Sequence, residues 1–212
     1  MVDHPAALLL TGGASRRLGR DKATLPIGAT TLSERTATLL REVARPVIEV
    51  GPGYTSLVHV REEPVGQGPL AAMAAGWAEL TRAEEPGRVG VLVVATDLPG
   101  LTIGLLRLLA GHPARGCLVP LDVAGHPQLL CARYPPVALA RAGRLVEQGR
   151  RAVGALLDGE EVTWLAPREW VAAAGSPGAL ADVDTPADLA SLPGWEAAGL
   201  ACLPGWEAAA GQ

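Results

Sequence analysis

The sequence lacks several features that would assign it to common classes of protein. Its 212 residues include three cysteines, Cys117, Cys131 and Cys202, and this odd number without CxxC spacing argues against a disulfide framework and a zinc site. No apolar run approaches the roughly 18 residues that a membrane span needs. The N-terminal segment has no cationic start before its short apolar run. We therefore expect a cytoplasmic protein that is not exported and has no membrane partner.

Positive charge is also sparse. The formal net charge is −4, and the basic residues are spread thinly outside a cluster between Arg16 and Lys22. Without a broad cationic face to bind a phosphate backbone, we expect no nucleic-acid partner. With 49% hydrophobic and 19% charged residues, the composition is instead typical of a soluble globular protein that has one sizeable core.

Short apolar runs alternate with helix-forming segments along most of the chain. Apolar runs predict strands over residues 6–13, 46–51, 89–95, 116–121, 127–134 and 161–167. Helical spacing or alanine-rich composition predicts helices over residues 32–43, 68–85, 103–111, 136–149 and 151–159. Thr31 and Thr102 are the expected caps of two of these helices. The alternation predicts an α/β fold, with three αβα layers around an open, mostly parallel sheet.

The C-terminal residues differ in kind from the rest. The segment LPGWEAAG at 192–199 recurs as LPGWEAAAG at 203–211, and two copies of so short a unit cannot build a core of their own. We therefore expect one domain over residues 1–191 and a loosely packed extension over 192–212. The alternative is that the tryptophans of the extension dock on the domain or on a second subunit.

The segment LLLTGGASRRLGRDK, residues 8–22, predicts a ligand site. In an open α/β sheet, ligands bind beyond the carboxyl ends of the strands, and the first predicted strand ends at Gly12 and Gly13. Glycines let the backbone approach phosphate oxygens, and the cations that follow supply charge. The segment contains neither the Walker A pattern nor GxGxxG. We expect it to hold a nucleoside triphosphate in a different way.

The same segment resembles the motif LxGGxSxRMGxDK of the molybdenum cofactor guanylyltransferases and related nucleotidyltransferases, with Leu18 in place of methionine. Three further pieces follow in family order, which are GQGPLAAM at 66–73, ATDLPGL at 95–101 and DVDTPADL at 182–189. The resemblance covers roughly residues 6–190 and implies a Rossmann-like nucleotidyltransferase fold. It also implies the transfer of GMP from GTP to the phosphate of molybdopterin or Mo-molybdopterin, with release of pyrophosphate and a requirement for Mg²⁺. Transient contact with molybdoenzymes or their chaperones would accompany that activity.

Candidate site residues follow from the motifs together with their chemistry. Asp97 comes directly after the strongest strand, where a carboxylate can bind Mg²⁺ beside substrate phosphates, and Asp184 is a second metal or acceptor ligand by analogy. Arg17, Lys22 and Asp97 are the expected catalytic residues, because Arg17, Lys22 and the Mg²⁺ that Asp97 would bind neutralise charge on the leaving pyrophosphate. The expected nucleotide-binding residues are Leu10, Thr11, Gly12, Gly13, Lys22, Glu62, Gly68 and Asp97.

Two departures from the family pattern leave alternatives open. Glu62, or Glu63 in another alignment, stands where the family reads the base with an aspartate, and the asparagine expected after the second strand is missing from VGPGYTS. A carboxylate can accept hydrogen bonds from guanine N1 and N2, but the longer side chain would sit differently. The alternatives are a cytidylyltransferase on the same cofactor, a sugar-phosphate nucleotidyltransferase, or a nucleotide-binding protein without turnover.

Overall fold

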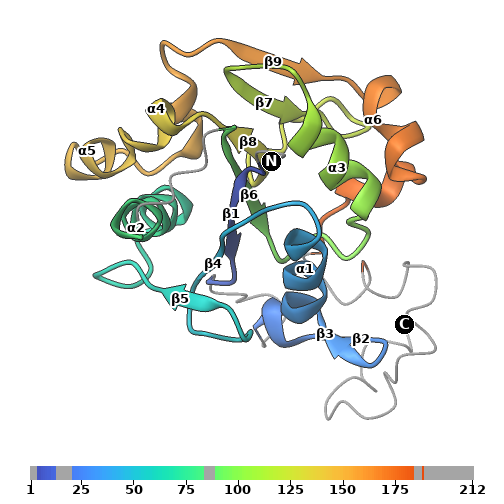
Figure 1. The fold of residues 1–212 in the computed structure, drawn as a ribbon, viewed down its shortest axis with the longest axis horizontal. Coiled ribbons are helices and arrows are strands. Elements are labelled where there is room, and N and C mark those ends of the chain that lie inside the picture. The colour runs from blue at the N-terminus through green and yellow to red at the C-terminus, as the bar shows by residue number, and fades with distance from the viewer. Residues whose placement is uncertain (1–3, 13–20, 84–88, 184–187, 189–212) are drawn as a thin grey trace, which may run out of the picture.

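The computed structural model describes residues 4–12, 21–83, 89–183 and 188, which form one sheet with helices on both faces (Figure 1). The strands of this sheet are β1 (Ala6–Leu10), β4 (Val47–Val50), β5 (Val58–Val60), β6 (Val91–Ala95), β7 (Cys117–Pro120), β8 (Cys131–Tyr134) and β9 (Val162–Leu165). The small strands β2 (Pro26–Ile27) and β3 (Thr30–Thr31) pair with each other. The helices are α1 (Leu32–Arg41), α2 (Pro69–Arg82), α3 (Ile103–Gly111), α4 (Pro136–Leu139), α5 (Ala142–Glu147) and α6 (Pro167–Ala174). Short 3₁₀ helices are η1 (Lys22–Thr24), η2 (Val153–Leu157) and η3 (Pro177–Leu180).

The sheet has the strand order β5-β4-β1-β6-β8-β7-β9, and it is mostly parallel. β1 lies between β4 and β6 and pairs parallel with both. β8 runs antiparallel to its two neighbours, β6 and β7, while β7 and β9 are parallel. The carboxyl ends of all strands but β8 therefore lie along one edge of the sheet, and β8 begins at that edge. This is the edge at which open α/β sheets bind ligands.

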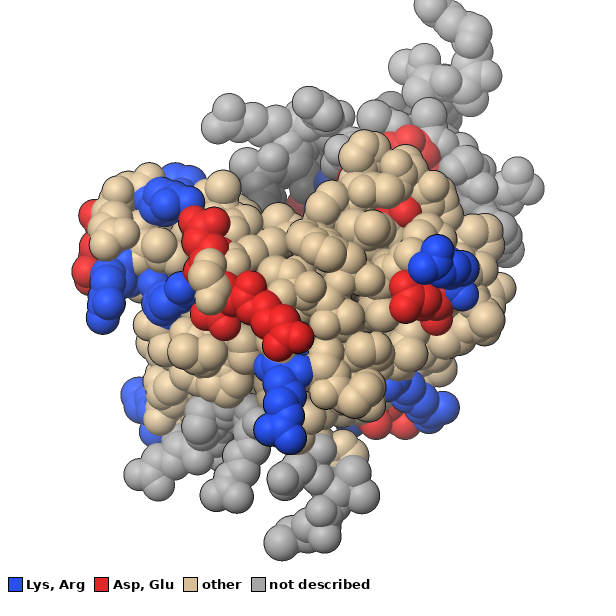
Figure 2. All heavy atoms as spheres, turned by 90° about the horizontal axis from the view of Figure 1, so that it is seen from above, with Lys and Arg blue, Asp and Glu red and all other residues tan. Residues whose placement is uncertain are grey.

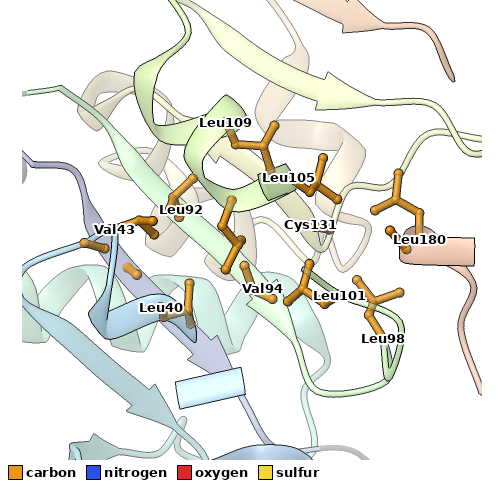
Figure 3. Close-up of a cluster of buried hydrophobic side chains, with 14 of the residues drawn as sticks. Leu40, Val43, Leu92, Val94, Leu98, Leu101, Leu105, Leu109, Cys131 and Leu180 are labelled. Carbon is orange, nitrogen blue, oxygen red and sulfur yellow. The ribbon is translucent and has the colours of Figure 1, made fainter. Parts of the chain in front are cut away.

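The sheet separates two apolar cores, because successive residues of its central strands point to opposite faces. On one face, Leu9 of β1 and Val94 of β6 pack with α1, α3 and α6, in the cluster shown in Figure 3. On the other face, Leu8 and Val93 pack with α2, α4 and α5. All five residues of β1 and of β6 are buried, as expected for parallel strands covered on both sides.

Local sequence explains where the main helices begin. The Glu34 amide donates to Thr31 Oγ1 (3.2 Å) at the start of α1, and the Leu105 amide donates to Thr102 Oγ1 (3.4 Å) at the start of α3, so both predicted caps are confirmed. α2 begins with Pro69 after Gly68, whose φ of +96° suits glycine. Gly76 lets α2 lie close to the sheet, because a Cβ there would meet the methyl groups of Leu8 and Val50.

Several elements differ from the sequence predictions. The single helix predicted over 136–149 is the pair α4 and α5, since the Arg141 amide bonds to the carbonyl of Ala138, three residues earlier, and tightens the chain between them. The helix predicted over 151–159 is the short 3₁₀ helix η2. β5 was not predicted because Val58 and His59 are exposed and give no apolar signal. α6 was not predicted, although Pro167 at its first position and Glu169, which accepts from the Ala166 amide (2.8 Å), are typical of a helix start.

Candidate functional site

The candidate site lies where β1, β4 and β6 end together. The Thr11 amide donates to the Val50 carbonyl (3.0 Å), and the Thr96 amide donates to the Leu10 carbonyl (3.3 Å). The three strands therefore stay hydrogen-bonded up to their carboxyl ends. The Leu10 side chain is buried in the core. Any contact of Leu10 with a ligand would therefore come from its backbone.

Two glycines allow the chains after β1 and β4 to approach each other. A Cβ on Gly51 would overlap Thr11 Oγ1 and would also lie 3.0 Å from the Gly12 amide nitrogen. The residue that follows β4 therefore has to be glycine while Thr11 keeps this position. Gly12 itself is exposed, as a backbone amide offered to a ligand must be.

Lys22 and Asp97 come together across this edge, as the sequence predicts. Lys22 opens η1, and its Nζ lies 4.0 Å from Asp97 Oδ2. The side chains are 17% and 34% exposed, so solvent reaches the pair only in part. The two residues are 75 positions apart in the chain (97 − 22) and meet at this edge of the sheet.

Asp97 is the candidate ligand for a divalent cation. It follows Thr96 directly after β6, and its carbonyl accepts a hydrogen bond from the Val183 amide (3.0 Å), which brings Val183 to this side of the site. Mg²⁺ is commonly bound by one or two carboxylates together with substrate phosphates, and a partly exposed carboxylate at a strand end suits that coordination. Within the residues that the structure describes, no three His, Cys, Asp or Glu side chains form a group that could hold a metal without such help.

Asp97 also affects a neighbouring thiol. Burial, and in second place the charge of Asp97, raise the pKa of Cys131 to about 12. Burial raises the pKa of Cys117 to about 11. Both thiols therefore stay protonated at neutral pH and pack as small apolar side chains in the two cores.

Sequence reasoning missed Glu49, a carboxylate in β4 that is 0% exposed. Its Oε1 accepts from the Thr11 hydroxyl (2.7 Å) and from the amides of Gly53 (3.0 Å) and Tyr54 (2.7 Å). Its Oε2 accepts from the amide (2.9 Å) and the hydroxyl (2.7 Å) of Thr55. Burial raises the pKa of Glu49, but these hydrogen bonds outweigh burial and hold the pKa below its ordinary value. The carboxylate thus binds the end of β1 to the loop that follows β4.

Tyr54 was also missed, and it links this loop to the segment that carries Lys22. Its hydroxyl donates to Asp21 Oδ2 (2.6 Å), and this hydrogen bond raises the pKa of the phenol. Asp21 Oδ1 accepts from the Ala23 amide (3.1 Å), so Asp21 is the cap of η1. From the sequence, the GPGYT segment has several backbone amides that can donate hydrogen bonds. Only the fold shows that they donate to Glu49, a carboxylate of the preceding strand.

Glu62 and Gly68 lie further along the same edge, after β5. Glu62 Oε1 accepts from the Gly66 amide (3.0 Å), which holds the turn before α2. Gly68 caps α2 without a side chain, and no atom lies within 4 Å of the position that a Cβ would take. Strands are spaced ~4.8 Å apart, so the end of β5 lies roughly 10 Å from the end of β1, two strands away. Glu63, the alternative in the alignment, is exposed.

The remaining predicted residues fall outside the described part of the chain. These are Gly13, Arg17 and Asp184, together with the repeated segment of residues 192–212. Their roles stay predictions.

Two surface properties bear on partners. Within the described ranges, no helix has both the length and the apolar character that crossing a lipid bilayer requires. The face shown in Figure 2 carries Lys and Arg side chains interspersed with Asp and Glu, so its described residues form a mixed surface.

Comparison with known proteins shows the family and the fold. Residues 7–162 match the family described as "MobA-like NTP transferase domain". A protein of Mycobacterium avium named "Probable molybdenum cofactor guanylyltransferase" is 36% identical over 197 residues, which is 88% of this chain and 94% of that protein. A protein of the same name from Mycobacterium bovis is 38% identical over 164 residues, covering 74% of this chain and 80% of that protein. The crystal structure of molybdopterin-guanine dinucleotide biosynthesis protein A from Archaeoglobus fulgidus superposes with a TM-score of 0.71 at 18% identity, over 86% of this chain and 94% of that one.

Proposed function

We propose, because this chain belongs to the MobA-like NTP transferase family, that it transfers GMP from GTP to the phosphate of molybdopterin or Mo-molybdopterin and releases pyrophosphate. The observation that carries the proposal is the meeting of Lys22 and Asp97 at the joined ends of β1 and β6. A cation and a carboxylate at that edge suit a triphosphate with its metal ion. The names of the relatives support guanine as the base and molybdopterin as the acceptor.

The reaction needs no general base from the protein. The acceptor is a phosphate monoester whose second pKa is about 6, so its oxygen is already ionised at neutral pH. Catalysis then consists of lining up that oxygen with the α-phosphorus and stabilising the charge on the leaving pyrophosphate. None of the described histidines has to take part.

Asp97 would bind Mg²⁺, with Asp184 as a second ligand to the metal or the acceptor. Bound there, Mg²⁺ would neutralise phosphate charge and hold the pyrophosphate as it leaves. Lys22, with its side chain only 17% exposed, would leave its contact with Asp97 and bind the phosphates, assisted by Arg17. The backbone of residues 10–13 would lie against the triphosphate.

The base would lie towards β5. Glu62 and Gly68 are the proposed contacts, and the roughly 10 Å between the ends of β1 and β5 suits a nucleotide whose phosphates lie beside β6.

We also propose that the protein works in the cytoplasm and that it transiently contacts molybdoenzymes or their chaperones, which receive its product. We propose as well that the nucleotidyltransferase domain ends at residue 191.

The test is a pyrophosphate-release assay with each of the four nucleoside triphosphates, Mg²⁺ and molybdopterin. We expect release with GTP and not with CTP, ATP or UTP. Release with CTP would identify a cytidylyltransferase, and no release with any nucleotide would contradict the enzyme assignment.

Asp97→Asn tests the site within the same assay. It should keep the circular dichroism spectrum and lose most Mg²⁺-dependent turnover, because the amide keeps the shape and removes the charge that binds the metal. Binding of Mn²⁺ in the presence of GTP, followed by electron paramagnetic resonance, should weaken in parallel. Asp158→Asn is the matched control, since Asp158 forms an exposed ion pair with Arg150 (2.9 Å) before β9, at the opposite edge of the sheet. Ordinary turnover and Mn²⁺ binding by Asp97→Asn would rule out Asp97 as the metal ligand.

A further inference from the structure

The proposed reaction does not use Glu49 or Tyr54 directly, yet both belong to one continuous set of contacts that ends at Lys22. Glu49 is fully buried and cannot touch a substrate. Its carboxylate accepts hydrogen bonds from Thr11, at the end of β1, and from residues 53–55. Five hydrogen bonds to one carboxylate give this loop a single conformation, because moving it would leave a buried charge without its donors.

The loop held by Glu49 presents Tyr54 to the segment that carries Lys22. The Tyr54 hydroxyl is 2.6 Å from Asp21 Oδ2, and the Ala23 amide is 3.1 Å from Asp21 Oδ1. Asp21 is therefore held on both carboxylate oxygens. Lys22 is the next residue in the chain, and its Nζ reaches Asp97. The contact between Tyr54 and Asp21 joins residues 33 positions apart and ties η1 to the sheet.

We propose that Tyr54 is a positioning residue for Lys22, with Glu49 as its anchor in the sheet. The proposal rests on the proposed function, in which Lys22 stabilises the departing pyrophosphate. The backbone of Lys22 fixes the region that its flexible four-carbon stem can reach, so holding that backbone keeps the ammonium within reach of the phosphates. A misplacement of ~1 Å at a catalytic group can reduce a rate by about a hundredfold.

The proposal makes a specific prediction about transition-state contacts. Tyr54 would act only through Lys22, so loss of its hydroxyl should affect the step in which Lys22 meets the developing charge. The affinity for GTP should change less, because many backbone and side-chain contacts contribute to it. Tyr54→Phe should therefore reduce kcat by about tenfold, equal to ~1.4 kcal/mol, while KM for GTP changes by less than about threefold.

The experiment is a double-mutant cycle on the full chain, with GTP, Mg²⁺ and molybdopterin as substrates. Tyr54→Phe, Lys22→Ala and the double variant are compared by kcat and KM, and thermal melting confirms that each is folded. If Tyr54 acts through Lys22, Tyr54→Phe should change kcat by less than about twofold when Lys22 is already alanine. Tyr134→Phe is the matched control, because its hydroxyl donates to the Leu129 carbonyl (2.7 Å) and not to Asp21. Its effect should be the same with and without Lys22.

The possible outcomes separate this proposal from the proposed function. Reduced kcat for Lys22→Ala, with an equal loss from Tyr54→Phe in both backgrounds, would overturn the positioning role and leave Lys22 as a catalytic residue. Unchanged kcat for Tyr54→Phe in the wild-type background would also overturn the positioning role of Tyr54. Ordinary kcat for Lys22→Ala would remove the catalytic role of Lys22 and the positioning proposal together. A large loss from Tyr54→Phe that disappears in the Lys22→Ala background would support it.

Discussion

Glu49→Gln tests how strongly the buried carboxylate holds the site together. The amide can keep its oxygen towards Thr11, Gly53 and Tyr54, which places its NH₂ group where Oε2 accepts from Thr55. The Thr55 hydroxyl can turn and accept, but the Thr55 amide would then face a donor. Turning the glutamine over is worse, because the NH₂ group would face the donors of three residues.

The magnitude follows from these contacts. One buried amide without an acceptor costs ~1–3 kcal/mol, and the three remaining hydrogen bonds lose the strengthening that a charged acceptor gives. The neutral glutamine costs less to bury than the ionised glutamate, and this difference offsets part of the loss. We expect a destabilisation of about 3 kcal/mol, which for a domain of this size lowers Tm by roughly 6–12 °C. The control is Glu161→Gln at an exposed glutamate, for which the change should stay within about 0.5 kcal/mol.

The pH dependence gives a second, independent check. The pKa of Glu49 is lower in the folded protein than in the unfolded chain, so its contribution to stability is fully present above the unfolded pKa of about 4.3. That contribution disappears as the pH falls towards the folded pKa. The difference in unfolding free energy between wild type and Glu49→Gln should be constant from about pH 8 to pH 5 and should narrow below that, as measured by urea unfolding at each pH. A Tm change under ~2 °C, or a difference that does not narrow on acidification, would refute the reasoning.

Two further predictions concern close packing and the C-terminal extension. Gly51→Ala should reduce turnover, because its Cβ would overlap Thr11 Oγ1 and move the end of β1, whereas Gly111→Ala, where no atom lies within 4 Å of the new Cβ, should leave turnover unchanged in the pyrophosphate assay. Equal turnover in the two variants would contradict the tight approach of β1 and β4. Deleting residues 200–212 should leave Tm and turnover nearly unchanged, because a short duplicated segment has little core to bury. A fall of several degrees in calorimetry would show instead that the extension docks.

The central strands, and the assignment of Lys22 and Asp97 to one site, could be predicted because the strand signals are local and the site residues lie in recognisable motifs. β1 and β6 are buried on both faces, so each is an unbroken apolar run. Once they are parallel neighbours, Gly12 and Asp97 must lie at the same edge of the sheet, whereas Lys22 lies further along the chain from β1 and was assigned from its motif. β5 gave no such signal, because it is an edge strand with exposed residues, and β8 could not be recognised as antiparallel because its direction depends on tertiary packing.

Glu49 shows why the rest of the site could not be predicted. In the run VIEV a single glutamate is typical of a strand with one exposed face, where the carboxylate would point to solvent. The structure buries it because donors from two other segments converge on it, and none of them lies in the strand itself. That convergence depends on the three-dimensional path of residues 51–55, which periodicity does not describe.

The reversal of β8 explains how one sheet edge can serve two substrates. β8 begins where β6 ends, and the Ala95 amide bonds to the Leu130 carbonyl (2.8 Å), so the connection between β7 and β8 lies at the same edge as Gly12 and Gly51. The proposed nucleotide side, formed by β1, β4 and β5, and the side formed by β8, β7 and β9 therefore meet at β6. Displacement of pyrophosphate at the α-phosphorus of GTP requires the attacking acceptor oxygen and the leaving pyrophosphate oxygen on opposite sides of that phosphorus. Asp97 lies at the end of β6, the strand that joins the two halves. In the proposed reaction, the metal ion that it binds would therefore lie between the nucleotide and the acceptor.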